Sequence, residues 1–233
     1  MAKLYVIATP IGNLEDITFR ALRILREVDL VICEDTRVTK KLLSRYDISK
    51  SLVSYHEHST PKIHEKIREM LAEGKSAALV TDAGTPGISD PGARLVAYLR
   101  ANLEGIEITP IPGPSALLAA ASVAGINMDQ FIFLGFPPHK KGRKTFFAGL
   151  AKSKVPIIFY ESTHRVARAF TELAAVLGDT AEIMVAREIT KIYEEIWRGA
   201  VKDAAAHFIG ERQRGEFVII IPKIKESAHG GRL

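Results

Sequence analysis

The sequence predicts an α/β protein made of two successive α/β units. Short apolar runs alternate with stretches whose apolar residues recur at helical spacing, and turn residues separate the two kinds of segment. The pattern then restarts at about residue 125. Such alternation is typical of a mostly parallel sheet covered by helices. With 233 residues, of which 47% are hydrophobic and 25% charged, the chain can build cores of this size.

The first unit is expected to contain five strands, each a short apolar run followed by turn residues. They are the segments 4–10, 29–35, 51–57, 76–82 and 106–113. Apolar residues at helical spacing predict helices between them, over 16–28, 37–46, 61–71, 91–103 and 114–125. Thr60–Pro61 and Asp90–Pro91 give the signature of a cap followed by proline at a helix start.

The second unit is expected to contain five further strands and three helices. The strands are 131–136, 156–162, 182–188, 194–200 and 216–222, and the helices are 142–152, 164–177 and 202–212. The last two strands are close together in the chain, which indicates an antiparallel portion. The predicted domains are therefore residues 1–118 and 119–224, followed by a polar tail over 225–233.

The charge balance permits an anionic partner without requiring one, because 32 Lys and Arg residues stand against 27 acids, a net charge of +5. The single cysteine, Cys33, excludes a disulfide within the chain and suits a reducing compartment. The apolar stretches are far below the roughly 20 residues that span a bilayer. We therefore expect a cytoplasmic protein with no membrane segment.

Four unusual segments follow predicted strands, at residues 9–13, 34–37, 81–92 and 111–116. Ligands of α/β sheets bind outside the carboxyl ends of the strands, so these loops are expected to border one crevice. Neither G-x-x-x-x-G-K-[ST] nor G-x-G-x-x-G is present after the first strand, which argues against a phosphate cradle. Asp82, beside glycines, instead suits a ligand with a cation and polar edges, such as S-adenosylmethionine. The alternative is a long turn that only caps the next helix through Asp90.

The segments "TDAGTPGISDPG", "CEDTRVTKKLL", "IPGPSA", "FYESTHR" and "REITK" together resemble the tetrapyrrole methylase superfamily and, more narrowly, its ribosomal RNA methyltransferases. The resemblance covers nearly the whole chain. It implies two α/β domains of the tetrapyrrole methylase type, with S-adenosylmethionine in the interdomain cleft, and a homodimer. The implied acceptor is a ribose 2′-oxygen of a cytidine in the decoding region of small-subunit ribosomal RNA. One departure is Thr163, where many members of the family have proline.

By this resemblance, three loops and part of the second domain contact the methyl donor. The implied residues are Pro10, Ile11, Gly12, Asp82, Gly84, Thr85, Ile88, Ser115, Ala116, Tyr160 and Ala186. Related enzymes have an acid where this chain has Thr85, so Asp82 is expected to take over that role.

"AREITK" offers Arg187, Glu188 and Lys191 as catalytic candidates. On a helix or on a strand, Arg187 and Lys191 share a face, and a neighbouring cation lowers the pKa of a lysine toward that of a usable base. A ribose hydroxyl is a poor nucleophile that benefits from such a group. The alternative is an ordinary solvated charge run.

Substrate contacts are expected from three further segments. Glu161, His164 and Arg165 follow a strand and can bind ribose or phosphate, although Glu161 and Arg165 can equally form a plain i, i+4 ion pair. Glu34 and Arg37 are expected to position the substrate. The Gly/Pro loop at 137–144 carries the cations expected to contact phosphate, unless it only solubilises the chain; they are Lys140, Lys141, Arg143 and Lys144.

No metal site is expected. His56 and His58 form an H-x-H pair that would share one face of a strand, but no further ligand cluster is evident and methyl transfer needs no metal. Two other functions stay open: a methylase of a small, tetrapyrrole-like molecule on the same fold, and a ribosome assembly factor without turnover.

Overall fold

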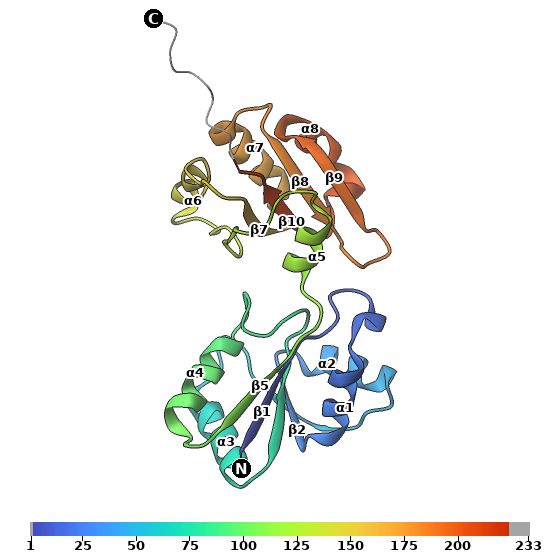
Figure 1. The fold of residues 1–233 in the computed structure, drawn as a ribbon, viewed down its shortest axis with the longest axis vertical. Coiled ribbons are helices and arrows are strands. Elements are labelled where there is room, and N and C mark those ends of the chain that lie inside the picture. Colours follow the sequence, from blue (N-terminus) through green and yellow to red (C-terminus); the bar gives the residue numbers. More distant parts are fainter. Residues whose placement is uncertain (1, 224–233) are drawn as a thin grey trace, which may run out of the picture. The chain divides into compact units, whose positions relative to one another are not determined.

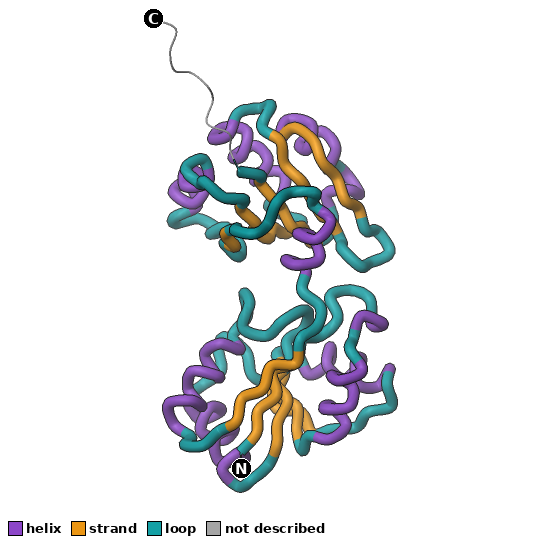
Figure 2. Tube along the Cα trace, viewed as in Figure 1, coloured by secondary structure: helices purple, strands orange, loops and turns teal. Residues whose placement is uncertain are grey.

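The computed structural model describes residues 2–223, so the polar tail predicted over 225–233 lies outside the described residues. The chain divides between Ser115 and Ala116 into two compact units. Figure 2 shows that each unit contains its own group of strands with helices around it. Among residues 2–223, no helix has the length and apolar character needed to cross a bilayer.

The first unit is built on a five-stranded sheet in the order β3-β2-β4-β1-β5. Figure 1 labels three of these strands, β1, β2 and β5. Every neighbouring pair is parallel. Because β1 and β4 are neighbours, the loops that follow them leave the sheet side by side. The strands are β1 (Lys3–Ile7), β2 (Leu30–Cys33), β3 (Ser51–Ser54), β4 (Ser76–Leu79) and β5 (Glu107–Ile111).

Helices cover both faces of this sheet. α1 (Phe19–Glu27) and α2 (Thr36–Arg45) pack on one face around residues such as Leu25 and Leu42. α3 (Pro61–Ala72) and α4 (Gly92–Asn102) pack on the other face, with Ile67 and Leu95 in its core. A short 3₁₀ turn, η1 (Leu14–Asp16), precedes α1. The chain therefore passes from β1 to one face and from β4 to the other, an arrangement that opens a binding site at the strand ends.

The second unit has a mixed sheet in the order β6-β7-β10-β8-β9. Only β6 and β7 are parallel, so the predicted antiparallel portion is confirmed. The last strand lies between β7 and β8 and is not next to β9. The strands are β6 (Ile132–Phe133), β7 (Ile157–Ser162), β8 (Glu182–Arg187), β9 (Glu195–Ala200) and β10 (Glu216–Ile221).

Three helices pack on one face of the second sheet around a core rich in phenylalanine, and α5 packs on the other. Their bounds are α5 (Ala116–Val123), α6 (Arg143–Leu150), α7 (Val166–Leu177) and α8 (Val201–His207). The helix predicted over 202–212 is shorter, because it ends at His207 and the chain continues as a 3₁₀ turn, η2 (Gly210–Gln213). Gly210 has a φ of 57°, a conformation that interrupts a right-handed helix.

The predicted strands are also longer than those in the structure, mainly at their carboxyl ends. β3 was expected to reach residue 57 but ends at Ser54. The backbone N–H of His56 instead donates to Ser59 Oγ at 2.8 Å, which closes a turn. The prediction that His56 and His58 share a strand face is therefore wrong. Among residues 2–223, no group of three or more His, Cys, Asp or Glu side chains is arranged to hold a metal ion.

Candidate functional site

The loops after β1 and β4 are joined to each other by backbone hydrogen bonds. Thr9 and Gly84 form an isolated antiparallel bridge, with N–H to O distances of 2.9 and 3.0 Å. The buried hydroxyl of Thr9 also donates to the carbonyl of Thr81 at 3.0 Å. Gly84 has a φ of 84°, which a residue with a side chain rarely adopts. Gly84 is therefore required for the path of this loop.

The loop after β5 joins the same group. The N–H of Ala8 donates to Ile111 at 3.2 Å, and Thr85 Oγ1 donates to the carbonyl of Pro114 at 3.2 Å. A Cβ on Gly113 would lie 3.1 Å from the Cβ of Ala8, so the two backbones approach closely. The segments at 9–13, 81–92 and 111–116 thus form one loop cluster, as their position after parallel strands predicted.

The segment after β2 is held to this cluster by Asp82, whose Oδ1 accepts the N–H of Asp35 at 3.0 Å. Asp35 also pairs with Arg37 at 2.6 Å, and hydrogen bonds from Arg37 lower the pKa of Asp35 to about 2. Arg37, predicted to position the substrate, is exposed but already has this acid as a partner. Of the predicted donor contacts in the cluster, Pro10 and Ile11 have buried side chains, whereas Gly12 and Ile88 are exposed.

Three carboxylates, those of Glu34, Asp82 and Asp90, gather at the cluster, with only the more distant charges of His56 and Arg37 acting on them among residues 2–223. Burial raises the pKa of Glu34, and the charges of Asp82 and Asp90 raise it further. In the part of the chain described, none of these three acids forms an ion pair; Glu34 accepts only a long hydrogen bond from Thr81, at 3.5 Å. Unbalanced negative charge of this kind favours a cationic ligand.

Replacing Glu34 with glutamine is expected to raise the melting temperature at pH 7. The folded state holds the Glu34 proton more tightly than the unfolded chain, so its stability falls as the pH rises above the ordinary pKa of glutamic acid, about 4.3. The gain should therefore shrink when melting is measured at pH 4. Glu15→Gln, a change at an exposed acid of η1, serves as the control. A lower melting temperature for Glu34→Gln at pH 7 would contradict a raised pKa of Glu34 in the folded protein.

Asp90 does more than cap the next helix. Its Oδ1 accepts the N–H of Gly92, the first residue of α4, and also that of Gly87, both at 2.8 Å. The cap position itself is Pro91, one residue later than expected. Asp90 therefore closes the end of the glycine-rich loop onto α4.

In the second unit, two residues predicted to contact the donor are largely enclosed by their own unit. Ala186 is 1% exposed and belongs to the core on the α5 side of the sheet. Tyr160 lies between the rings of Phe133 and Phe136, and its hydroxyl accepts the N–H of Leu117 at 3.1 Å. Burial raises the pKa of Tyr160, so its hydroxyl stays protonated.

The predicted catalytic pair is not formed as expected. Lys191 lies in the turn after β8, with its Nζ 2.9 Å from Glu188 Oε1 and 2.8 Å from Glu216 Oε2. The guanidinium of Arg187 instead donates to the carbonyls of Arg214, Tyr193 and Glu211 at 2.7, 3.2 and 3.1 Å.

These contacts reverse the expected pKa shift of Lys191. Partial burial acts to lower the pKa, but hydrogen bonds to Glu216 and Glu188 outweigh it, and the pKa is raised. The prediction of a lysine with a lowered pKa is therefore wrong. Lys191 is an ammonium held between two carboxylates.

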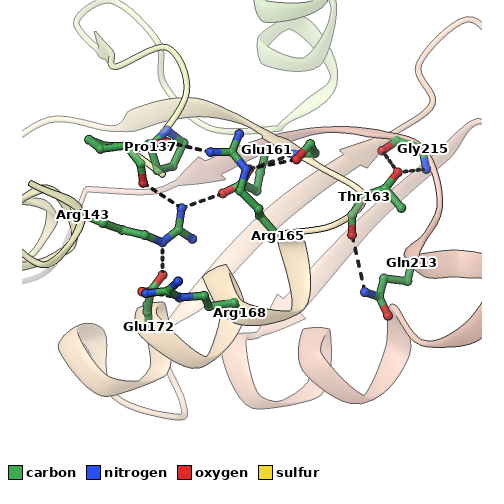
Figure 3. Close-up of polar contacts among 11 residues, drawn as sticks. Pro137, Arg143, Glu161, Thr163, Arg165, Arg168, Glu172, Gln213 and Gly215 are labelled. Carbon is green, nitrogen blue, oxygen red and sulfur yellow. Dashed lines mark hydrogen bonds and ion pairs between the residues drawn. The ribbon is translucent and has the colours of Figure 1, made fainter. Parts of the chain in front are cut away.

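Glycine and threonine residues hold Glu188 in place. Gly215 has a φ of 115°, and a Cβ there would overlap the side chain of Glu188. Thr163 Oγ1 donates to the carbonyl of Gly215 and accepts its N–H, both at 2.7 Å (Figure 3). This accounts for Thr163, because proline has no hydroxyl to make these bonds.

The structure contradicts two predicted substrate contacts, Glu161 and Arg143. The Glu161 side chain is 0% exposed and lies between Arg143 at 3.2 Å and Arg165 at 2.9 Å (Figure 3). Arg143, 1% exposed, also binds Glu172 at 2.7 Å. Both are therefore structural, and the i, i+4 ion pair between Glu161 and Arg165 is the correct interpretation. His164 is exposed after β7.

The same network holds the loop that precedes α6. Arg165 Nη1 donates to the carbonyl of Pro137 at 3.0 Å, and Arg143 Nη1 donates to that of Pro138 at 3.3 Å. Three of the cations predicted to contact phosphate, Lys140, Lys141 and Lys144, are exposed. The loop therefore presents cations to solvent from a base fixed by buried charges.

Comparison with known proteins agrees with this architecture. The family model described as Tetrapyrrole (Corrin/Porphyrin) Methylases matches residues 3–205. The solved structure of a cobalamin biosynthetic enzyme, cobalt precorrin-4 methyltransferase, superposes with a TM-score of 0.70 at 21% identity, over 94% of both chains. The fold is therefore the predicted pair of α/β units of the tetrapyrrole methylase type.

Curated relatives give a narrower match. A protein of Thermotoga maritima named ribosomal RNA small subunit methyltransferase I is 45% identical over 95% of this chain and 98% of its own length. The protein of that name from Bacillus subtilis is 45% identical over 95% of this chain and 75% of its own. The chain belongs to the tetrapyrrole methylase family and, within it, to the group named ribosomal RNA small subunit methyltransferase I.

Members of this family use S-adenosylmethionine as the methyl donor. The loop cluster of the first unit fits such a group. Its carboxylates at Glu34, Asp82 and Asp90 have no ion-pair partner within residues 2–223, and the donor carries a sulfonium and an ammonium. Gly84 and Gly87 lie in the same loop as Asp82 and Asp90, and both have positive φ. Because glycine has no side chain, the main chain at these two positions is not covered by one.

Proposed function

We propose that this protein transfers a methyl group from S-adenosylmethionine to a ribose 2′-oxygen of a cytidine in the decoding region of small-subunit ribosomal RNA. The observation that carries the proposal is the 45% identity, over 95% of the chain, to proteins named for methylation of this RNA. Exposed cations on the loop before α6 support an RNA acceptor over a small tetrapyrrole-like molecule.

The first-unit loop cluster is proposed to hold the methyl donor. When bound, S-adenosylmethionine supplies an electrophilic methyl group on a positively charged sulfur. The carboxylates of Asp82 and Glu34 would balance that charge, and Gly84, at positive φ, sets the path of the loop that would border the donor. The remaining proposed contacts of the first unit are Gly12, Thr85, Ile88 and Ser115; Ala116, also proposed, is the first residue of α5 in the second unit.

Lys191 is proposed to act as a cation, because its raised pKa keeps the ammonium protonated. An ammonium near the acceptor would stabilise negative charge that develops on the ribose oxygen as its proton passes to solvent water, and this kind of stabilisation needs a donor held in advance. Glu188 and Glu216 hold the Lys191 ammonium in this way at 2.9 and 2.8 Å.

One assay tests the function and separates its alternatives. Purified small subunits lacking the modification and, in a parallel reaction, a porphyrin-like acceptor are incubated with the protein and methyl-labelled S-adenosylmethionine, and the RNA is digested to nucleosides. Label on the ribose of cytidine supports the proposal. Label only on a porphyrin-like acceptor supports a small-molecule methylase, and binding without label supports an assembly factor.

Replacing Asp82 with asparagine is expected to weaken binding of S-adenosylmethionine about tenfold or more. The amide oxygen can still accept the N–H of Asp35, so the loop stays in place while the charge is lost. Calorimetric titration measures the dissociation constant. Glu104→Gln, an exposed acid before β5 at the opposite edge of the sheet, is the matched control. Equal affinities for the two variants would argue against a role for Asp82.

A homodimer, implied by the family resemblance, and a cytoplasmic location, expected from the short apolar stretches of the sequence, remain predictions. Light scattering on the eluting protein should give twice the 25.6 kDa of one chain. A mass of one chain across the micromolar range would contradict the dimer.

A further inference from the structure

Two helices on one face of the first sheet form a continuous outer surface. α1 and α2 share a core on that face and lie side by side in Figure 1. Arg26 NH2 at the end of α1 donates to the carbonyl of Tyr46, the residue after α2, at 3.2 Å. Lys50 Nζ donates to the carbonyls of Arg26 and Val28, both at 2.6 Å. The two helices are thus fixed to each other at their carboxyl ends.

This surface is strongly basic. α1 and α2 together hold seven of the chain's 32 basic residues and one of its 27 acidic residues. The rest of the chain therefore carries 25 cations against 26 anions and is close to neutral. The two helices, with nineteen residues in total, therefore account for the net positive charge of the protein.

Most of these cations form no ion pair within residues 2–223. Arg23 pairs with Glu27 at 2.9 Å and Arg37 with Asp35 at 2.6 Å. The other five are exposed and, among residues 2–223, form no ion pair; they are Arg20, Arg26, Lys40, Lys41 and Arg45. We call these five residues the α1–α2 basic surface.

Helix stability does not account for this arrangement. Arg26 and Arg45 lie in the last turns of their helices, where a cation is favourable. Arg20 lies in the first turn of α1, where a cation is unfavourable, and Lys40 and Lys41 are adjacent in the middle of α2. At least these three residues therefore need another explanation.

The surface begins beside the loop cluster. α2 follows β2 closely, and α1 follows β1 after the loop 8–18 that contains η1, so Arg20 lies at the amino end of α1, the end that this loop enters. Phe19, the residue before it, is 93% exposed. An exposed aromatic ring next to cations is typical of surfaces on which an unpaired base stacks while its phosphates are neutralised.

We propose that the α1–α2 basic surface binds the phosphate backbone of the RNA substrate along the side of the first unit, separately from the loop before α6. This inference rests on the proposed function and adds a second RNA contact to it. Charge complementarity carries it, because RNA offers a regular row of phosphates and the surface offers five exposed cations that form no ion pair within residues 2–223.

The test compares two triple variants with the same loss of charge. Arg20→Gln/Lys40→Gln/Lys41→Gln removes three cations from the surface. Lys62→Gln/Lys66→Gln/Arg100→Gln removes three exposed cations of α3 and α4, on the opposite face of the same sheet, and none of these forms an ion pair within residues 2–223. The dissociation constant of a small-subunit ribosomal RNA transcript is measured across a range of KCl concentrations for both variants and for the unmodified protein.

We expect the first variant to lower the slope of log affinity against log salt by about 2, since each lost phosphate contact removes about 0.7 for single-stranded nucleic acid. The second variant should keep the slope of the unmodified protein. Equal slopes in the two variants would overturn the proposal. Loss of binding to intact subunits but not to the transcript would also overturn it, because the partner would then be a ribosomal protein.

Failure of the proposed function would look different. In that case the unmodified protein itself would show no salt-dependent affinity for the transcript and no ribose label, whatever the variants do. Circular dichroism melting of both triple variants confirms that each is folded. A Phe19→Ala variant should bind the transcript about tenfold more weakly with an unchanged salt slope, because stacking neutralises no charge.

Discussion

Replacing Glu161 with alanine is expected to lower the free energy of unfolding by about 3–5 kcal/mol, the cost typical of breaking a buried ion pair. The carboxylate is fully buried between Arg143 and Arg165. Its removal leaves the Arg143 guanidinium, 1% exposed, with Glu172 as its remaining acid. Urea denaturation followed by circular dichroism measures the loss.

The matched control is Glu27→Ala, which breaks the exposed pair with Arg23 on α1. An exposed pair of this kind contributes under about 1 kcal/mol, so this variant should unfold close to the midpoint of the unmodified protein. If Glu161→Ala were no less stable than Glu27→Ala, the buried network would not stabilise the second unit.

Replacing Lys191 with alanine is expected to lower the rate of methyl transfer about 100-fold or more while leaving the affinity for S-adenosylmethionine unchanged. The magnitude is that of losing one preorganised group that stabilises charge in a transition state. Single-turnover transfer of labelled methyl to small subunits gives the rate, and calorimetry gives the affinity.

Lys191→Arg distinguishes a role for charge from a role for the amine. The guanidinium of arginine stays charged at all working pH values. Partial activity of Lys191→Arg would therefore support a role for the positive charge, and loss of all activity would support a contact specific to the amine. Lys202→Ala, an exposed lysine of α8, should have no effect. Full turnover by Lys191→Ala would remove this residue from the mechanism.

The sequence predicted the fold because its signals are local. Each strand of the first sheet is a short apolar run, and each loop after it carries the glycines, prolines and acids that end a strand. In a parallel sheet the carboxyl ends of all strands lie at the same end of the sheet, so these loops are expected there from the sequence alone. This is why Thr9, Gly84 and Pro114, which are far apart in the chain, could be expected in one cluster.

The corrections concern partners that lie far away in the sequence. In "HKKGRK" all the cations look equivalent, but Arg143 is buried against Glu161 and Glu172, 18 and 29 residues later. One local signal was available: Arg143, Phe147 and Leu150 follow helical spacing, which places the arginine on the buried face of α6.

The pKa of Lys191 was missed for the same reason. The sequence shows Arg187 four residues earlier, but the structure places Glu216, 25 residues later, against the Lys191 ammonium because β10 pairs with β8. Strand order in a mixed sheet is set by packing of the whole unit and cannot be read from the turn itself. The basic positions of α1 and α2, in contrast, were visible as charges between the apolar positions of two predicted helices.

The loop before α6 is fixed through its main chain, because Arg165 and Arg143 donate hydrogen bonds to the carbonyls of Pro137 and Pro138. The exposed side chains of the loop take no part in these bonds. Every residue has a main-chain carbonyl oxygen, so these hydrogen bonds do not depend on the side chains of Lys140, Lys141 or Lys144. The tip of this loop is therefore a place where residues can be exchanged, in evolution or by design, while the folded frame beneath it stays the same.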